Sequence, residues 1–315
     1  MRACRYHALG ERSPPRVEEV AKPVPAAGEV LVRMRCASLN PVDWKIASGK
    51  FRLLVRGGVP RTMGSDFSGE VAATGAGIDG WATGDPVMGF IDPFARAAGT
   101  FADYVAVPEP FVMRRPASMG EAVAAALPCV GITAVALCNL TRIESGSRVL
   151  VNGASGGVGH LAVQVAKARG AHVTATASEG RRAFVTGLGA DEFIDYRAQS
   201  AERWPGEFDA VLDCVPNLPR SIHRRLLRRG GHYASTLPDA WTYTLDPLLN
   251  RLGRFGRHAV MLQPDRAAMA ELLRYFEQGV LICEVAREFR LEDVAEAIEC
   301  SRSGRVAGKL VIRVA

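Results

Sequence analysis

Paired cysteines are missing from this sequence of 315 residues. It contains seven cysteines, but none of them forms a C-x-x-C pair. Their scattered spacing therefore predicts neither a disulfide framework nor a structural zinc knuckle. Most have apolar neighbours, which favours buried thiols. The seven positions are Cys4, Cys36, Cys129, Cys138, Cys214, Cys283 and Cys300.

Membrane-spanning segments and targeting signals are also missing by our reading of the sequence. We identify no apolar run that approaches the ~20 residues needed to span a bilayer. Residues 1–15 lack the long apolar core of a secretory signal, and a strand pattern starts almost at once. We therefore expect a cytoplasmic protein with no membrane partner.

Neither sign of charge dominates the composition. The net charge is +6, with 48% hydrophobic and 23% charged residues, as in ordinary globular enzymes. The length suggests two domains. Two arginine clusters leave nucleic-acid binding open, but they fit solvated helix faces and attraction of an anionic cofactor better. The clusters are Arg224, Arg225, Arg228 and Arg229, and then Arg251, Arg254 and Arg257.

The most informative stretch is residues 148–178, RVLVNGASGGVGHLAVQVAKARGAHVTATAS. Residues 148–152 form an apolar, β-branched run that is typical of a buried parallel strand. A glycine-rich turn follows, then a helix that ends near Gly170, and then a second strand at 172–177. Strand, glycine turn, helix and strand in about 30 residues predict a dinucleotide-binding site.

The turn has a specific physical logic. Ala154 stands where the first glycine of G-x-G-x-x-G would stand, while Gly156 has no Cβ and lets a pyrophosphate approach the backbone. Gly159 lets the helix pack tightly on the strand. Free N–H groups at the helix start, together with its dipole, would hold the phosphates. We therefore assign to cofactor binding Ala154, Ser155, Gly156, Gly157, Val158 and Gly159.

The rest of the chain divides into two patterns. Residues 1–122 are β-rich, with strands expected at 30–36, 69–74, 85–90 and 101–107. Residues 120–139 predict two helices broken by Pro128 and Gly131. From 148 onward, strands and helices alternate. Strands are expected at 148–152, 172–177, 192–196, 210–215, 232–236 and 258–263, and helices at 158–169, 179–188 and 218–228, the last ended by Gly230 and Gly231.

These patterns predict an α/β protein with a β-rich catalytic domain and a doubly wound, six-stranded parallel sheet. We expect the catalytic domain over 1–122, the nucleotide-binding domain over 123–263, and a return to the catalytic domain over 264–315. The last segment predicts a helix at 265–278, a strand at 284–289, a helix at 291–302 and a final strand at 308–314 that packs on the N-terminal domain.

Several segments in order resemble the medium-chain dehydrogenase/reductase superfamily, and within it the zinc-independent, zeta-crystallin-like quinone oxidoreductases. The matching segments are Asn40-Pro-Val-Asp43-Trp-Lys, Gly64-Ser-Asp66-Phe-Ser-Gly69, Gly99-Thr-Phe-Ala-Asp-Tyr-Val, Leu127-Pro-Cys-Val-Gly131-Ile-Thr133, the glycine turn, Phe208-Asp-Ala-Val-Leu-Asp213 and Gly304-Arg-Val-Ala-Gly308-Lys309. The resemblance implies a GroES-like β domain, a Rossmann domain, a cleft between them for NADPH and substrate, and a homodimer.

The end of the second strand of the nucleotide-binding pattern bears on the choice of cofactor. NAD-preferring sites usually end this strand with an acid that binds the ribose hydroxyls, whereas Ser178 follows it here. Ser178 would donate a hydrogen bond to a 2′-phosphate, and Arg181 or Arg182 would supply charge; we choose Arg182. Tyr196 matches a phosphate-contacting tyrosine in similar reductases. We therefore expect NADPH, unless Glu179 turns into the pocket.

The resemblance also bears on metal chemistry. Zinc-dependent relatives have a cysteine near the Asn40 position and a His-Glu pair near Ser65 and Asp66, and a four-cysteine lobe holds their structural zinc. This sequence lacks all of these, so we expect no metal. Alcohol oxidation is difficult without a Lewis acid, whereas reduction of a quinone or an electrophilic C=C bond needs less help.

The resemblance suggests Asn40 and Asp43 as catalytic candidates near the nicotinamide, although ordering of the loop explains Asp43 equally well. Phe51 would line the substrate mouth, and Thr133 would contact the nicotinamide side of the cofactor. Lys309 fits a structural role better than a chemical one. The function indicated is NADPH-dependent reduction of quinones, enones or enals. An enoyl-thioester reductase, or a non-catalytic NADPH-binding protein with an RNA or protein partner, remains as an alternative.

Overall fold

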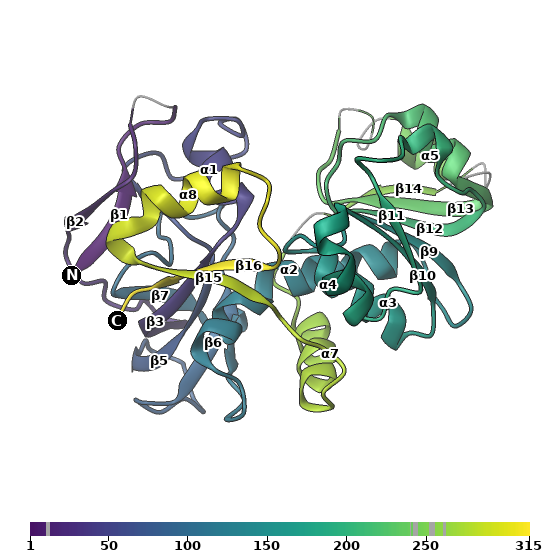
Figure 1. Ribbon diagram of the computed structural model, residues 1–315. Coiled ribbons are helices and arrows are strands. Elements are labelled where there is room, and N and C mark those ends of the chain that lie inside the picture. Colours follow the sequence, from purple (N-terminus) through teal and green to yellow (C-terminus); the bar gives the residue numbers. More distant parts are fainter. Residues whose placement is uncertain (11–12, 240, 242–244, 252–255, 261–262) are drawn as a thin grey trace. The chain divides into compact units, whose positions relative to one another are not determined.

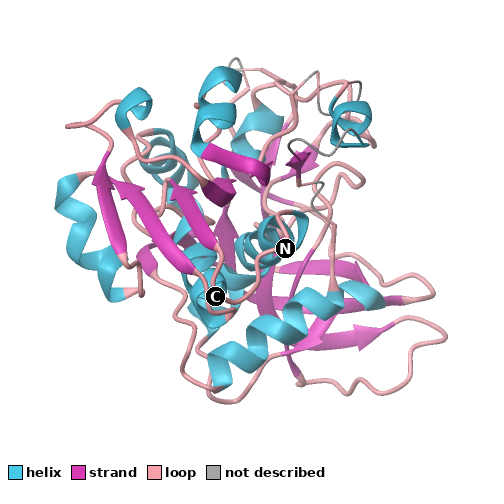
Figure 2. Ribbon diagram, turned by 90° about the vertical axis from the view of Figure 1, so that its right-hand side faces the viewer, coloured by secondary structure: helices cyan, strands magenta, loops and turns pink. Residues whose placement is uncertain are grey.

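The computed structural model describes residues 1–10, 13–239, 241, 245–251, 256–260 and 263–315, and the chain forms two compact units (Figure 1). Unit 1 comprises Met1–Cys129, Gln263–Arg266 and Cys283–Ala315, and unit 2 comprises Val130–Leu262 and Ala267–Ile282. In Figure 2 the strands form sheets with helices packed against them.

Helix α7 (Arg266–Glu277) shows that the sequence boundary at 264 needs correction, because all but its first residue belongs to unit 2. Two contacts attach this segment to the end and the middle of α3 (Gly159–Ala168), the first helix after β9 (Arg148–Asn152) in unit 2. Arg169 Nη2 lies 3.1 Å from Glu271 Oε1. Gln164 Nε2 donates to the Ile282 carbonyl at 2.8 Å, and its Oε1 accepts from the Ile282 N–H at 2.7 Å. The periodicity of α7 carried no information about which unit it would pack on.

Unit 1 is built on a seven-stranded sheet with the order β15-β16-β3-β5-β6-β8, in which β7 also pairs with β3. Strand β16 runs antiparallel to β3 and places Leu310 opposite Leu39, so the C-terminal segment packs on the N-terminal strands as expected. The strands are β3 (Glu29–Leu39), β5 (Asp66–Thr74), β6 (Pro86–Phe90), β7 (Tyr104–Pro108), β8 (Val112–Arg114), β15 (Val285–Arg290) and β16 (Lys309–Arg313).

The remaining elements of unit 1 surround this sheet. A smaller antiparallel sheet has the order β2-β1-β4, from β1 (Arg2–Tyr6), β2 (Arg16–Glu19) and β4 (Arg61–Thr62). Helix α8 (Val294–Arg302) buries Val294, Ala297 and Ile298 in the same core. Our sequence reading missed α1 (Pro41–Ala47). Its start carries ordinary N-terminal signals, with Asn40 at the N-cap, Pro41 at the first position and an acid, Asp43, at the third.

Unit 2 contains a six-stranded, all-parallel sheet with the order β11-β10-β9-β12-β13-β14. Numbered within this domain, the order is 3-2-1-4-5-6, which confirms the predicted doubly wound sheet. The strands are β9 (Arg148–Asn152), β10 (His172–Ala177), β11 (Glu192–Asp195), β12 (Phe208–Asp213), β13 (Leu227–Ser235) and β14 (Gly256–Ala259); the helices between them are α3 (Gly159–Ala168), α4 (Arg182–Gly187), α5 (Arg220–Leu226) and α6 (Asp246–Arg251).

The fourth connection of this sheet differs from the prediction. Helix α5 ends at Leu226, and β13 begins at Leu227, which lies opposite Phe208 of β12. The pair of glycines expected to end the helix therefore lies inside a strand, where Gly230 has a φ of 82°. Leu227 turns from helix to strand because it packs beside Phe208 in the core. The predicted last strand extended over 261–262, which lie outside the described residues.

Helix α2 (Glu121–Leu140) is one helix, although we expected Pro128 and Gly131 to break it in two. Proline removes one backbone donor, and the next N–H, that of Cys129, donates to Asp66 Oδ1 at 2.8 Å. An outside acceptor therefore stabilises the helix where its own bonds are lost. By length and composition α2 could cross a membrane, which our reading of the sequence overlooked, but 78% of its apolar window is buried in the protein. The core helix of a soluble protein can have the same length and the same apolar composition.

Candidate cofactor and active site

The glycine turn of unit 2 begins one residue earlier than the motif suggests. Gly153 has a φ of 78°, a conformation that favours glycine, and a Cβ there would lie 2.5 Å from Val215 Cγ2. Ala154, at the motif's first position, is fully buried. The tight turn after β9 is therefore made by Gly153, which explains why alanine is tolerated at position 154.

The other two glycines of the motif differ in their surroundings. A Cβ on Gly159 would lie 2.1 Å from the carbonyl oxygen of Gly153 and 2.8 Å from Cα of Ala154, so only glycine allows this close approach of α3 to the turn. A Cβ on Gly156 would meet only the Gly153 carbonyl oxygen, at 3.4 Å. The space beside Gly156 is open on its other sides, as a site for a bound group requires.

Backbone donors at this turn fit an anionic ligand. In the part of the chain that the structure describes, the N–H groups of Ser155, Gly157 and Val158 donate to no protein acceptor. They precede α3, whose N-terminus carries a partial positive charge. Orphan N–H groups at a helix start bind phosphate oxygens. The turn therefore fits the pyrophosphate of a dinucleotide.

A polar network that the sequence reading missed supports this turn. It joins the carboxyl ends of adjacent strands: Thr176 Oγ1 donates to Asn152 Oδ1 at 2.8 Å, and Asn152 Nδ2 donates to Asp213 Oδ1 at 2.8 Å. Tyr233 donates its hydroxyl proton to Asp213 Oδ2 at 2.7 Å. The Gly153 N–H donates to Thr176 Oγ1 at 3.1 Å. Burial raises the pKa of Asp213 to about 6, against the opposing effect of these donors.

The residues proposed for the 2′-phosphate lie together at the neighbouring strand ends. Strands β10 and β11 pair in parallel with Ala177 opposite Asp195, so Ser178 and Tyr196 follow at the same edge of the sheet. Tyr196 is 48% exposed. Sequence reasoning missed Arg197, whose guanidinium lies 5.8 Å from the centre of the Tyr196 ring. The position directly after Tyr196 was the available signal.

Arg182 lies on the same side but already has a partner. Its Nε donates to Glu179 Oε1 at 2.7 Å and its Nη2 donates to Glu179 Oε2 at 2.9 Å. Its guanidinium also lies over the Phe193 ring, 4.3 Å from the centre. Because both charges are more than half exposed, the pair contributes little to stability, and a phosphate could compete for the arginine.

In unit 1, a buried polar group that we call the Lys309 cluster contains the two catalytic candidates. Its members are Ser38, Asn40, Asp43, Ser65, Asp66 and Lys309, and each is less than 5% exposed. Sheet register brings them together: Ser38 lies opposite Asp66 in β3 and β5, and β16 begins with Lys309 next to the end of β3.

The ammonium of Lys309 occupies the centre of this cluster. Its Nζ donates to Asn40 Oδ1 at 2.5 Å and to the Leu39 carbonyl at 3.2 Å, and lies 3.7 Å from Asp66 Oδ2. The same Asp66 oxygen accepts from Ser38 Oγ at 2.7 Å and from Asn40 Nδ2 at 2.8 Å. The side-chain amide of Asn40 is therefore engaged at both its oxygen and its nitrogen.

Asp43 fixes the start of α1 within the cluster. Its Oδ2 accepts from the Asn40 N–H at 2.7 Å, and its Oδ1 accepts from Ser65 Oγ at 3.2 Å. Burial raises the pKa of Asp43 to about 7, and the nearby Asp66 charge adds to this effect. Burial also raises the pKa of Asp66, against the opposing charge of Lys309. A cavity of about 10 Å³ borders Asp43, which is room for about one water molecule.

The cluster does not fit a zinc ion. Amide, hydroxyl and carboxylate oxygens around an ammonium are a poor donor set for Zn²⁺, which prefers thiolate and imidazole ligands. The described residues contain no group of three or more His, Cys, Asp or Glu side chains placed to hold a metal. The positive charge at Asn40 and Asp66 is supplied by Lys309.

The last two predicted residues lie in separate units. Phe51, in unit 1, is partly buried against the core and meets Phe94 edge to face, with the ring centres 5.7 Å apart. Thr133, in the part of α2 that belongs to unit 2, is 6% exposed. The described structure therefore brings Asn40 and Asp43 together, and separately the glycine turn, Ser178 and Tyr196.

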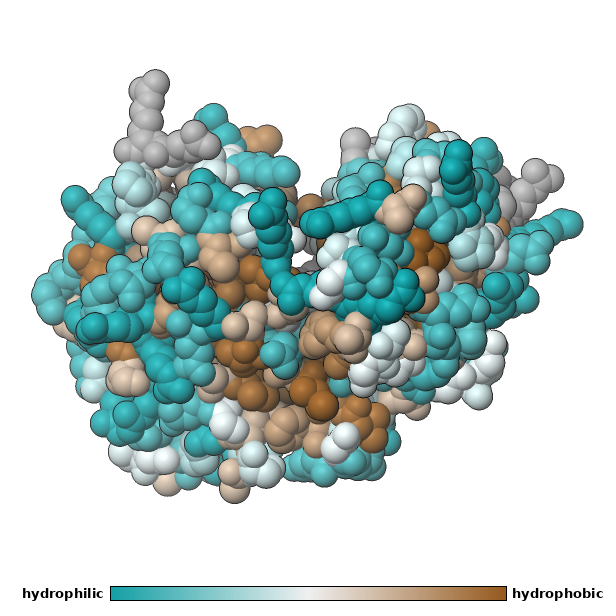
Figure 3. All heavy atoms as spheres, viewed as in Figure 1, coloured by the Kyte–Doolittle hydropathy of each residue, from teal (hydrophilic) through white to brown (hydrophobic). Residues whose placement is uncertain are grey.

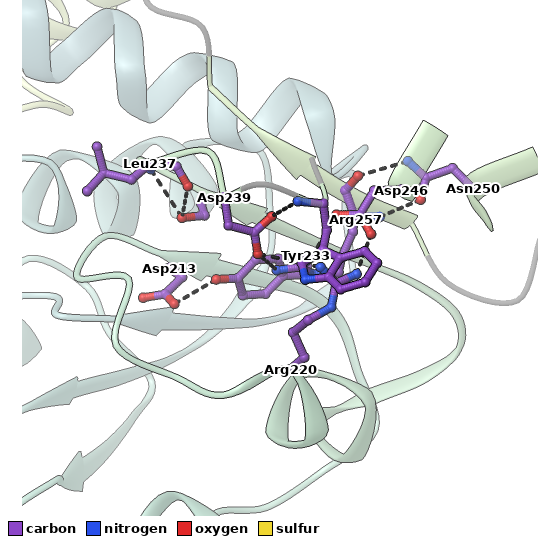
Figure 4. Close-up of polar contacts among 10 residues, drawn as sticks. Asp213, Arg220, Tyr233, Leu237, Asp239, Asp246, Asn250 and Arg257 are labelled. Atoms are coloured by element: carbon purple, nitrogen blue, oxygen red, sulfur yellow. Dashed lines mark hydrogen bonds and ion pairs between the residues drawn. The ribbon is translucent and has the colours of Figure 1, made fainter. Parts of the chain in front are cut away.

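Three arginines of the two clusters, Arg225, Arg228 and Arg257, are engaged within the protein, whereas Arg224 and Arg229 are exposed. Arg257 and Arg220 both pair with the buried carboxylate of Asp246, the former at 2.6 Å, and both also lie beside Asp239 (Figure 4). Arg228 pairs with Asp209. Arg225 donates to the carbonyls of Trp204 and Ala201. The side chain of Arg251 and all of Arg254 lie outside the described residues. These contacts weaken the case for a nucleic-acid surface.

Comparison with known proteins agrees with this geometry. Residues 26–117 match the family described as alcohol dehydrogenase GroES-like domain, and residues 188–312 match the family described as zinc-binding dehydrogenase. The chain is 31% identical to the chloroplast envelope quinone oxidoreductase homolog of Arabidopsis thaliana, over 99% of this chain and 98% of that protein. It is also 31% identical to the 2-methylene-furan-3-one reductase of Solanum lycopersicum, over 99% of this chain and 79% of that protein.

A solved structure gives the same result. The quinone oxidoreductase from Coxiella burnetii superposes with a TM-score of 0.90 at 28% identity, over 100% of this chain and 99% of that one. The similarity therefore extends over both units.

Proposed function

Because the chain belongs to the medium-chain dehydrogenase/reductase superfamily, as an NAD(P)H-dependent oxidoreductase of the quinone oxidoreductase and enone reductase type, we propose that it is a zinc-independent, NADPH-dependent reductase of quinones or α,β-unsaturated carbonyl compounds. The proposal specifies the cofactor, the absence of a catalytic metal and the electrophilic acceptor.

The observation that carries the proposal is the position of the Lys309 ammonium. It lies 2.5 Å from Asn40 Oδ1 and 3.7 Å from Asp66, at the positions where the resemblance places zinc ligands in metal-dependent relatives. A second cation there would meet strong repulsion in a buried site. Without a Lewis acid, the acceptor must already be electrophilic, as a quinone or an enone is.

When bound, NADPH supplies the hydride, and the substrate's own carbonyl accepts the negative charge. The protein's contribution is then binding and orientation. The glycine turn would hold the pyrophosphate with the free N–H groups of Ser155, Gly157 and Val158. Asn40 and Asp43 would act by fixing the start of α1, because their polar atoms are engaged in the Lys309 cluster.

The preference for NADPH rests on Ser178 and its neighbours. A carboxylate at this position would repel a 2′-phosphate, whereas the Ser178 hydroxyl would donate to it. Tyr196 and Arg197 follow the adjacent strand and lie on the same edge. Arg182 would join them once its guanidinium exchanges Glu179 for the phosphate.

The test is consumption of NADPH with a panel of quinones, enals, enones and enoyl thioesters, with NADH in parallel. The proposal predicts turnover that requires an added quinone or enone and survives chelators. Tight NADPH binding without turnover on any acceptor would leave a non-catalytic binding protein, and turnover restricted to thioesters would indicate an enoyl-thioester reductase. Sedimentation of the same sample tests the homodimer that the resemblance implies.

A further inference from the structure

The loop that follows α1 in unit 1 displays an adjacent pair of leucines to solvent. Leu53 is 93% exposed, the highest value for any large apolar side chain that the structure describes, and Leu54 is 61% exposed. Single exposed leucines need no explanation, but an adjacent pair at a loop tip does. Figure 3 shows hydrophilic side chains over most of one face, with hydrophobic ones gathered in patches.

This loop is held in place at its base. Phe51 and Val55 pack against the core of unit 1, and the Phe51 ring contacts that of Phe94. The Arg56 N–H donates to the Phe94 carbonyl at 2.8 Å. The two leucines are therefore exposed on a loop whose base is fixed, because its other apolar residues pack against the core.

A buried arginine strengthens the same base. Arg61 is 2% exposed, and its guanidinium donates to the carbonyls of Arg56, Pro93 and Arg96, the Pro93 contact at 2.7 Å. Burial of a guanidinium is costly unless its donors are satisfied. Arg61 therefore joins the segment that carries Leu53 and Leu54 to the loop at 92–97.

Among the residues that the structure describes, none is a counterion for the cations around Leu53 and Leu54. Lys50, Arg52 and Arg56 are exposed, and their own side chains form no ion pair or hydrogen bond with any residue that the structure describes. The sequence has no acidic residue from 44 to 65. Several other arginines of unit 1 pair with carboxylates, as Arg2 does with Asp103 and Arg114 with Asp85.

We infer that residues 50–56, which we call the leucine loop, dock the protein on a membrane surface that carries anionic lipids. Leu53 and Leu54 enter the boundary between headgroups and acyl chains, while Lys50, Arg52 and Arg56 contact lipid phosphates. The net charge of +6 attracts the whole chain to such a surface. Peripheral docking needs no spanning segment. It revises our expectation from the sequence that the protein has no membrane partner.

Each class of residue contributes a measurable part of the binding. A cation near an anionic surface contributes about 1 kcal/mol, or roughly fivefold in affinity. Stable association needs both an apolar and an electrostatic contribution, because either alone is weak and reversible. The leucine loop supplies both within seven residues. The inference concerns binding alone and does not depend on the proposed reductase activity.

The experiment is flotation of the full chain with vesicles of phosphatidylcholine alone or of phosphatidylcholine with phosphatidylglycerol, without cofactor. We expect binding to the anionic vesicles, little binding to the neutral ones, and loss of binding at high salt. The double change Leu53→Ser and Leu54→Ser should reduce partitioning at least tenfold. Val24→Ser, on a valine of the same unit that is 86% exposed, should leave it unchanged.

Charge changes have a matched control as well. Arg52→Gln should weaken binding to anionic vesicles about fivefold. Arg290→Gln removes a cation on β15 whose side chain is 81% exposed and lies 3.7 Å from Glu292, far along the chain from the leucine loop, and it should have little effect. Wild-type protein that fails to float with anionic vesicles would overturn the inference, as would equal effects of the leucine and Val24 changes. A leucine variant that alters only self-association would instead assign the loop to a second copy of the chain.

Discussion

Substitutions of two residues in the glycine turn, Gly156 and Gly159, should separate effects on cofactor binding from effects on stability. In Gly156→Ala, the new methyl meets only the Gly153 carbonyl oxygen, at 3.4 Å, and the backbone has an ordinary φ. We expect the free energy of unfolding to stay within about 1 kcal/mol of wild type, with a small gain from lower entropy of the unfolded chain. Affinity for NADPH should fall at least about tenfold, or ~1.4 kcal/mol, because the methyl occupies the space for the pyrophosphate.

Gly159→Ala is the matched change, and it should act mainly on the stability of the fold. Its methyl would lie 2.1 Å from the Gly153 carbonyl oxygen and 2.8 Å from Cα of Ala154, and both are backbone atoms that cannot rotate away. Overpacking of this kind costs about 1–3 kcal/mol. The variant should therefore be less stable than wild type with or without cofactor, and it should also bind NADPH poorly because the turn is displaced.

Urea unfolding and calorimetric titration with NADPH measure both quantities on the same samples. If Gly156→Ala binds NADPH as tightly as wild type, the pyrophosphate does not approach this turn. If Gly159→Ala and Gly156→Ala are equally stable, the close approach of α3 to the turn is not what requires glycine at position 159.

Three further changes test the electrostatics. Asp43→Asn should alter the pH dependence of unfolding, because the raised pKa of the Asp43 carboxyl stabilises the wild-type fold fully below about pH 4 and no longer does so once the pH has risen through about 7. The free energy of unfolding of wild type minus that of the variant should therefore fall by up to about 1.4 kcal/mol per pH unit between these limits. A difference that stays flat with pH would contradict this prediction. Ser178→Asp should weaken NADPH binding at least about tenfold without weakening NADH binding, as titration with both cofactors would show; equal losses would refute the phosphate role. Lys309→Met should destabilise the fold by about 3–5 kcal/mol in denaturant unfolding, because it leaves a buried carboxylate unpaired; Asp66→Asn added to it should restore part of the loss, and additive losses would disprove the pairing.

The elements with a regular hydrophobic pattern were predictable from the sequence. The six parallel strands of a doubly wound sheet follow from hydrophobic periodicity and the alternation of strands with helices, and the return of the C-terminal strand was expected as well. The continuity of α2 could not be predicted from the sequence, because Pro128 removes a backbone hydrogen bond and the compensating acceptor is a distant residue, Asp66. Leu227 likewise becomes a strand residue through its pairing with Phe208. Local pattern cannot show either contact.

The sequence could group candidate site residues where one short stretch carries them. The glycine turn and the residues after β10 and β11 lie within such stretches, although Gly153 and Arg197 were missed. The Lys309 cluster unites residues far apart in the sequence, and Asn40 and Lys309, which are in direct contact, are 269 positions apart. Sequence reasoning placed Lys309 at the end of the chain in a structural role, and only the sheet register revealed that its ammonium lies against Asn40 and Asp66.

The central claim is NADPH-dependent reduction without a metal. The most direct measurement is the rate of acceptor-dependent oxidation of NADPH and of NADH by metal-stripped protein, with a quinone or enone from the panel. The account predicts an undiminished rate after removal of metal, and kcat/KM at least about tenfold higher for NADPH than for NADH. Activity that disappears on stripping and returns with zinc would contradict the account.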